Sequence, residues 1–270
     1  MHTIWKGSIS FGLVHIPIKL FAATESKQIH LRQLHQECHT PIKYDKVCPV
    51  CEEKVDQDEI VKGYEYDKGH FVVLDDDELE AIAAAKSKTI DIIDFIQLKE
   101  IDPIYFNRSY FLGPTENGEK AYTLLKRAME ETEKVAMAKF ILRAKEQLAA
   151  IRVYQKALLI ETLHYPDEIR PVDHVPGLVD LDLEEKELKM AKQLIEQLTT
   201  DFEPEKYTDE YRAKLKDMIE NKITGNEIKI AREVPETDIK SLMDALQESI
   251  QQTKKKTKRR RTTKKKAKTS

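Results

Sequence analysis

The most regular pattern of hydrophobic and polar positions opens the chain, in residues 4–21 (IWKGSISFGLVHIPIKLF). Hydrophobic side chains alternate first at odd positions and then at even ones, which predicts β-strands with one buried face. Because a slip of one residue sends every side chain to the opposite face, the change of phase at residues 12–14 predicts a bulge, a sharp bend or a tight turn. Pro17 removes one backbone donor, which predicts an edge position or a bulge in the second half.

Several later segments also carry strand patterns. Residues 29–34 fit either a strand or a short helical turn. Residues 135–163 contain Ala-rich stretches that favour a helix and alternating stretches that favour strands, and we predict successive strands there. A hairpin with Gly69 in its turn and two strands rich in β-branched and aromatic residues complete the set, over residues 60–66, 70–74, 89–97 and 104–112.

Helical patterns are inserted among the strands and then replace them. Asp75 with Glu78 three residues later forms a capping box that opens a helix. Pro235 and Thr237 open the last helix, which reaches Ile250, and Gly225 fits the position after a helix end. The other predicted helices cover residues 117–131, 183–198 and 207–223.

This order of elements predicts an α+β fold. Many strands with two inserted helices, followed by helices only, are typical of a β-barrel core with a helical arm. We place the core at residues 1–180, the helical C-terminal region at 181–252 and a tail at 253–270.

Charge is strongly separated along the 270 residues, although the net charge is only −3. Of 45 Lys and Arg, eleven lie in the tail, which leaves 34 against all 48 Asp and Glu in the preceding chain. Such asymmetry predicts a nucleic-acid-binding arm that has no core of its own and is disordered in isolation. The tail cations are Lys254, Lys255, Lys256, Lys258, Arg259, Arg260, Arg261, Lys264, Lys265, Lys266 and Lys268.

The chain has three cysteines, which fits a reducing compartment and metal or redox use better than a disulfide framework. Cys48 and Cys51 flank Pro-Val, a spacing that directs two thiolates at one tetrahedral cation, and His35 with Cys38 offers a matching pair. We predict a structural zinc-ribbon hairpin over residues 35–51, with residues 42–47 as a strand. His39 is an alternative fourth ligand, and a redox pair or inert buried thiols are the other interpretations.

Several function classes find no support in the sequence. No run of eighteen hydrophobic residues exists, so we expect an intracellular protein without a membrane span. The phosphate-binding GxxxxGK[ST], HExxH and G-x-S-x-G motifs are absent. A zinc-dependent nuclease would need clustered carboxylates, and the dense acidic run at residues 75–77 is better interpreted as a helix start.

Three segments together resemble the bacterial Ku family. The string WKGSISFGLVHIPIKLF looks like the opening signature of that family, IYFNRSYFLGP resembles a segment in the middle of its domain, and residues 202–228 resemble its short helical region. The lysine-rich end is similar to the variable extension of many members. The resemblance covers roughly residues 1–230 in matching order.

The resemblance implies a Ku-type β-barrel, an intertwined homodimer and a ring threaded by a double-stranded DNA end. It also implies recruitment of an ATP-dependent DNA ligase for non-homologous end joining, no enzyme chemistry, and a cytoplasmic location with the nucleoid. Many relatives lack the cysteine pair, so the zinc prediction depends on spacing alone. We expect the ligase to bind the amphipathic helices of residues 183–225.

A protein that accepts any broken end has to bind phosphates and duplex shape, because the sequence at a break is arbitrary. The folded part is acidic, so its cations must gather on the inner face of the ring. Candidates are the basic residues that interrupt strands on the polar phase: Lys6, Lys19, Lys27, Arg32, Lys43, Lys46, Arg108, Arg143 and Arg152.

A second hypothesis is a zinc-ribbon protein, associated with the nucleoid or transcription, that coats DNA through its basic tail. A ring threads ends and therefore requires linear DNA, whereas a coating protein binds closed circles equally well.

Overall fold

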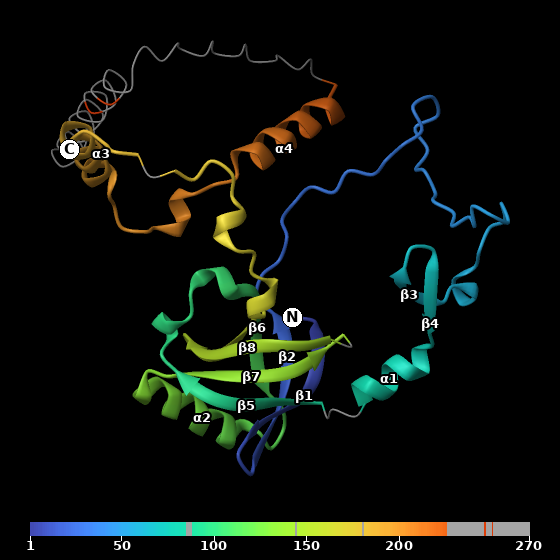
Figure 1. Cartoon of the computed structure of the whole chain (residues 1–270), viewed down its shortest axis with the longest axis horizontal. Helices are drawn as coiled ribbons and strands as arrows, with labels where there is room; N and C mark the ends of the chain where they lie inside the picture. The colour runs from blue at the N-terminus through green and yellow to red at the C-terminus, as the bar shows by residue number, and fades with distance from the viewer. Residues whose placement is uncertain (85–87, 144, 180, 226–245, 247–249, 251–270) are drawn as a thin grey trace. The chain divides into compact units, whose positions relative to one another are not determined.

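The computed structural model describes the chain except residues 85–87, 144, 180, 226–245, 247–249 and 251–270 (Figure 1). The chain divides into two compact units, Met1–His174 and Val175–Ser270. The strands of the described residues all lie in the first unit, and the helices α3 and α4 lie in the second.

Seven strands of the first unit close into a barrel in the order β1-β2-β6-β9-β8-β7-β5, which confirms the predicted barrel core. Neighbouring strands are antiparallel except β1 and β5, which close the barrel through a short parallel pairing from Ser8 to Ser10. The barrel strands are β1 (Thr3–Phe11), β2 (Val14–Ala22), β5 (Thr89–Ile96), β6 (Phe106–Pro114), β7 (Val135–Leu142), β8 (Lys145–Tyr154) and β9 (Ala157–Leu163).

The change of phase near Gly12 is a tight turn between β1 and β2. Gly12 has a φ of +59°, which glycine adopts without steric cost, and Leu13 is fully exposed at the tip. β2 as a whole lies between β1 and β6, but its ladder with β6 begins only at Ile18, so the predicted edge position holds locally at Pro17. The Pro17 carbonyl accepts from Thr115 N at 3.0 Å, next to the last β2–β6 pair, so the missing N–H faces the end of that ladder.

Alternate residues of the strands fill the barrel. Ile9, Ile18 and Ile90 are fully buried there, and the Trp5 ring meets Phe140 edge to face at 6.0 Å between centroids. The helix α2 (Glu119–Thr132) adds Tyr122, Leu125 and Met129 to the same core.

The Tyr122 hydroxyl joins α2 to the barrel wall. It donates to the Leu112 carbonyl and accepts from Leu158 N, both at 2.7 Å. Leu112 and Leu158 form the last register pair of the β6–β9 ladder. One buried side chain therefore satisfies the two backbone groups at which this ladder ends.

The segment between β2 and β5 has little regular structure. The predicted hairpin is confirmed as β3 (Lys62–Asp67) and β4 (His70–Leu74), with Gly69 at a φ of +79° in the turn. The helix α1 (Asp76–Ala84) begins as predicted, and the Glu78 carboxylate accepts from Asp75 N at 3.0 Å. The strand or helical turn at 29–34 and the strand at 42–47 are wrong, because isolated bridges alone occur near them.

The second unit contains two confirmed helices, α3 (Glu185–Leu198) and α4 (Glu210–Ile223). The Asp209 side chain accepts from Arg212 N at 2.9 Å and begins α4, while Gly225 follows its end at a φ of +73°. The third predicted helix and the basic tail fall almost entirely on residues outside those that the structure describes.

Candidate nucleic-acid interface

The structure places Lys6 and Lys19 directly opposite each other on β1 and β2. Their neighbours in sequence point into the barrel, so both lysines face outward. Neither has an ion-pair partner among the residues that the structure describes. Like charges directly opposite each other destabilise a sheet, and an anion bound between these two lysines would relieve their repulsion.

Arg108 and Arg143 line one cleft of the barrel, between the start of β6, the β7–β8 turn and the end of β9. Lys145 lines the same cleft, and sequence reasoning missed it. Lys145 follows Arg143 by two residues, and this closeness could have identified it. The turn that brings the two side chains to one cleft becomes clear only from the pairing of β7 with β8.

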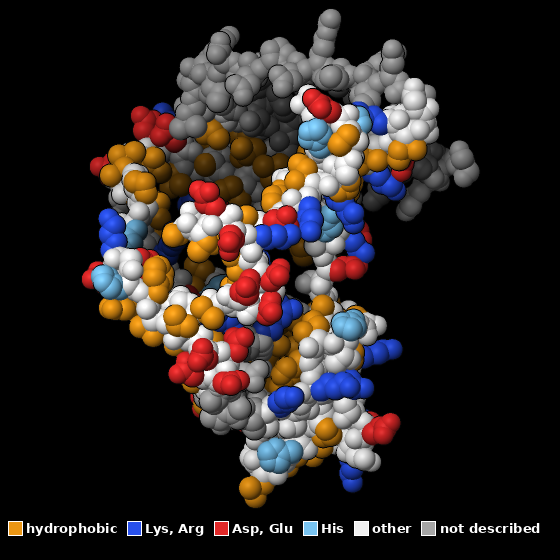
Figure 2. Space-filling model, turned by 90° about the vertical axis from the view of Figure 1, so that its right-hand side faces the viewer, with side chains coloured by type: hydrophobic (Ala, Val, Ile, Leu, Met, Phe, Trp, Pro, Cys, Tyr) orange, Lys and Arg blue, Asp and Glu red, His pale blue; other side chains and the backbone are white. Residues whose placement is uncertain are grey.

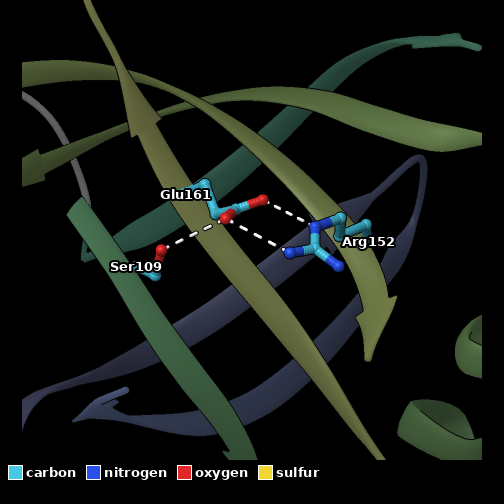
Figure 3. Close-up of polar contacts among 3 residues, drawn as sticks. All are labelled: Ser109, Arg152 and Glu161. Atoms are coloured by element: carbon cyan, nitrogen blue, oxygen red, sulfur yellow. Dashed lines mark hydrogen bonds and ion pairs between the residues drawn. The ribbon is translucent and has the colours of Figure 1, made fainter. Parts of the chain in front are cut away.

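Arg152 is the candidate most fully engaged within its own chain (Figure 3). Its Nε and Nη2 atoms donate to Glu161 at 2.6 and 3.3 Å, and Ser109 Oγ donates to the same carboxylate at 3.1 Å. The guanidinium also lies 5.5 Å from the centre of the Tyr154 ring. Its side chain is 25% exposed, so Arg152 presents little free positive charge.

The other four candidates lie on the irregular segment after β2, and all are exposed. Lys27 pairs with Glu25, and Lys46 donates to the Gln57 side chain. Lys43 lies 3.6 Å from Asp45. Arg32 has no partner in the described part of the chain. The predicted cations are therefore distributed over several places, and Figure 2 shows Lys and Arg interspersed with Asp and Glu on the face that it draws.

The four predicted metal ligands form two turns with the same backbone pattern. His35 N donates to Thr40 O and Cys48 N to Glu53 O, both at 2.9 Å. His39 N and Glu52 N each donate back to the first residue of the turn, again at 2.9 Å. The residue after the second ligand is left-handed in both turns, with φ of 53° at His39 and 55° at Glu52. Each predicted pair thus occupies an equivalent turn.

Each turn brings its two ligand side chains together. His35 Nδ1 lies 3.2 Å from Cys38 Sγ, and Cys48 Sγ lies 3.6 Å from Cys51 Sγ. Backbone hydrogen bonds, chiefly from Cys51, lower the pKa of the Cys48 thiol, whereas the shared hydrogen bond with Cys48 raises the pKa of Cys51. The described residues contain no cluster of three or more potential ligands, so the two turns stand apart. Residues 42–47 do not form the predicted connecting strand.

Hydrophobic side chains open to solvent accompany these turns and the β3–β4 hairpin, and Figure 2 shows others over much of one face. On the hairpin the exposed ones are Tyr64, Tyr66, Phe71, Val72 and Val73. No helix in the described ranges is long and hydrophobic enough to cross a membrane.

Comparison with known proteins identifies the family. The sequence model of the Ku70/Ku80 beta-barrel domain matches residues 10–196. A protein of Bacillus subtilis strain 168, named non-homologous end joining protein Ku, is 52% identical over 94% of this chain and 83% of its own length. Proteins with the same name from Heliobacterium modesticaldum and Desulfitobacterium hafniense are 49% and 46% identical over 94% of this chain, and the matches cover 93% and 88% of their own lengths. As the resemblance predicted, the chain belongs to the bacterial Ku family.

Proposed function

We propose that this chain binds double-stranded DNA ends regardless of sequence, as a homodimer that acts in non-homologous end joining. The observation that carries the proposal is the unpaired Lys6–Lys19 pair on the outer face of a Ku-type barrel. Such a pair contacts phosphates, which every DNA sequence presents alike. The protein acts as a scaffold without enzyme chemistry of its own, in the cytoplasm with the nucleoid.

The exposed hydrophobic residues of the hairpin support a dimer. A two-stranded sheet is marginally stable by itself, and both faces of β3–β4 are open to solvent. Tyr64 and Phe71 are 65% and 60% exposed, so a second copy that covers them removes two large aromatic surfaces from water. Two such arms complete a ring around the duplex.

The helical unit is our candidate for recruitment of the ATP-dependent DNA ligase. The helix α3 exposes Leu188, Ile195 and Leu198 at helical spacing. Amphipathic helices of this kind bind partner proteins by placing their hydrophobic face in a groove of the partner. Deletion of residues 183–250 is expected to abolish stimulation of the ligase and to leave end binding in place. Full stimulation by the truncated protein would exclude this region.

We also propose that zinc links the two equivalent turns through His35, Cys38, Cys48 and Cys51. Two imidazole or thiolate donors are already paired in each turn, and zinc prefers four such donors in a closed tetrahedral shell. His35 is favoured over His39 because its ring already contacts Cys38. A closed shell leaves no position for substrate, so the metal would stabilise the arm.

The zinc proposal is tested by metal content. The purified chain is expected to contain one zinc per polypeptide, Cys48→Ser to lose it, and His39→Asn to keep it. A wild-type chain free of zinc, and unchanged in thermal stability by a chelator, would contradict the proposal.

The proposed function is tested by pairing linear and closed circular duplexes of the same sequence in a gel-shift series. A ring requires an end, so the linear form is expected to be bound and the circle not. Equal binding of both forms would contradict end binding and favour a DNA-coating protein, a hypothesis that the comparisons do not favour.

A further inference from the structure

The cleft lined by Arg108, Arg143 and Lys145 has a volume of about 660 Å³. This lies within the range of small-molecule sites, roughly 300–1,000 Å³. Its other polar walls are rich in hydrogen-bond donors, including Asn107 and Gln147. The cleft is therefore large enough for a phosphate group with part of its nucleotide.

A bulge in β6 directs Arg108 to the cleft. Phe106 pairs with Leu163 and Ser109 with Glu161, so two residues of β6 oppose the single residue Thr162 of β9. The Thr162 hydroxyl accepts from Arg108 N at 3.1 Å and donates to Arg108 O at 3.3 Å, and thereby satisfies the backbone that the bulge leaves unpaired. Bulges re-aim side chains and are frequent beside functional sites.

Arg143 lines the cleft from the turn between β7 and β8. It lies in the β7–β8 turn with a φ of 52°, a left-handed conformation that favours glycine. An arginine in this place carries a conformational cost that a glycine would avoid. Gln155 has the same φ of 52° at the equivalent position of the β8–β9 turn, so the hairpin turn accounts for this backbone conformation.

The carboxylates of the cleft are already engaged. Glu146 accepts from the Tyr165 hydroxyl at 3.2 Å and lies 3.7 Å from Lys139 Nζ. Glu168 accepts from Tyr165 N at 2.8 Å and lies 3.5 Å from His164 Nδ1. In contrast, Arg108, Arg143 and Lys145 form no ion pair with any residue that the structure describes. Three free cations thus face the same space.

We propose that this cleft binds a phosphate group of the DNA, through Arg108, Arg143 and Lys145. Arginine forks match phosphate oxygens in a bidentate manner, and a lysine adds a point charge. The phosphate is either the terminal monoester of a strand end or a diester of the backbone. This inference rests on the proposed function and adds a defined phosphate site to it.

The test measures affinity and its salt dependence for Arg108→Gln, Arg143→Gly and Lys145→Gln. Arg127→Gln on α2, an exposed arginine outside the cleft, is the matched control. The probes are a linear duplex with 5′-phosphates, the same duplex with 5′-hydroxyls, and a closed circle. Each cleft variant is expected to bind phosphorylated ends roughly tenfold more weakly, the usual effect of losing one charged hydrogen bond.

The two sources of phosphate give different results. If the cleft binds a terminal monoester, the variants are expected to lose affinity for the phosphorylated duplex and not for the duplex with 5′-hydroxyls. If it binds a backbone diester, they are expected to lose the same affinity for both linear duplexes. In that case the slope of log affinity against log salt also becomes smaller by about 0.9 for each cation removed. Arg143→Gly is expected to melt at the wild-type temperature or above it, which separates binding from folding.

Cleft variants that match Arg127→Gln with both linear duplexes would overturn the cleft proposal and leave a wild-type preference for ends over circles intact. If the wild-type protein shows no such preference, the proposed function fails. In that case the cleft proposal is tested by the salt dependence of binding to the closed circle. Slopes equal to that of the wild type in all three variants would overturn the cleft proposal.

Discussion

At the scale of single residues, Lys6 and Lys19 are expected to lower the stability of the barrel and to raise its affinity for DNA. Two ammonium groups directly across a strand pair repel each other. We expect the double variant Lys6→Gln, Lys19→Gln to be at least as stable as the wild type, by up to about 1 kcal/mol. Its DNA affinity is expected to fall, with a salt slope smaller by about 0.9 for each phosphate that the variant no longer neutralises.

Thermal melting and a salt titration measure both effects. Lys156→Gln, in the β8–β9 turn, is a suitable control because it removes one exposed lysine from another part of the barrel. A double variant with the affinity and salt slope of this control would show that the lysine pair does not touch DNA.

Tyr122 makes the second prediction at this scale. Tyr122→Phe leaves the Leu112 carbonyl and the Leu158 N–H buried without their partner, which is expected to cost about 1–3 kcal/mol of unfolding free energy. Burial also raises the pKa of Tyr122 above its ordinary value of 10.0. The folded state then holds this proton more tightly than the unfolded state, so the contribution is full below pH 10 and is lost as the pH rises further.

Urea unfolding at neutral and alkaline pH measures this contribution. The wild type is expected to lose more stability than Tyr122→Phe between pH 9 and 11, a window roughly centred on the ordinary tyrosine pKa. Equal stability of the two proteins at neutral pH would contradict the role of the hydroxyl.

The individual site residues were the least predictable part of the sequence. Lys6 and Lys19 were identifiable because they stand on the polar phase of alternating strands. The bulge that directs Arg108 depends on the pairing of β6 with β9, two strands far apart in sequence. The ion pair of Arg152 with Glu161 depends on the register between β8 and β9, which the sequence does not show either.

At the scale of elements, periodicity decided what could be predicted. The barrel strands alternate because one face lines the core, so their positions follow from the sequence within a few residues. The chain between β2 and β3 has no such pattern, and the strands proposed there did not form. Pro17 lies just before the β2–β6 ladder begins, although β2 is an inner strand of the closed barrel, a neighbour that sequence alone does not show.

The basic tail makes a prediction at this scale. Deletion of residues 254–270 removes eleven cations and no hydrophobic core, so DNA binding is expected to weaken and to become visibly less dependent on salt. Dimerisation is expected to be unchanged in sedimentation experiments. An identical salt slope for the truncated protein would show that the tail does not touch DNA.

The β3–β4 hairpin makes another prediction. Replacement of Tyr64 and Phe71 by serine removes exposed aromatic surface that a second copy would cover. The variant is expected to dissociate at protein concentrations where the wild type stays dimeric. Tyr207→Ser, an exposed aromatic outside the hairpin, is the control. A dimer as tight as that of the control would exclude the hairpin from the interface.

At the scale of the whole molecule, the charge of the chain before the tail is poorly suited to DNA, with 34 basic and 48 acidic side chains. Affinity from charge alone would be modest for such a protein, since phosphate contacts supply most non-specific binding. A ring retains DNA by enclosure, so slow escape requires only a few well-placed cations. We propose that Lys6, Lys19 and the cleft arginines are of this kind.

The central claim is that two copies enclose a severed duplex. It is tested most directly by loading the protein on a linear plasmid, ligating the plasmid closed and then raising the salt concentration. Enclosure predicts that the protein stays on the resealed circle and is released when a restriction enzyme cuts that circle. Release from resealed and linear plasmids at the same rate would contradict the account.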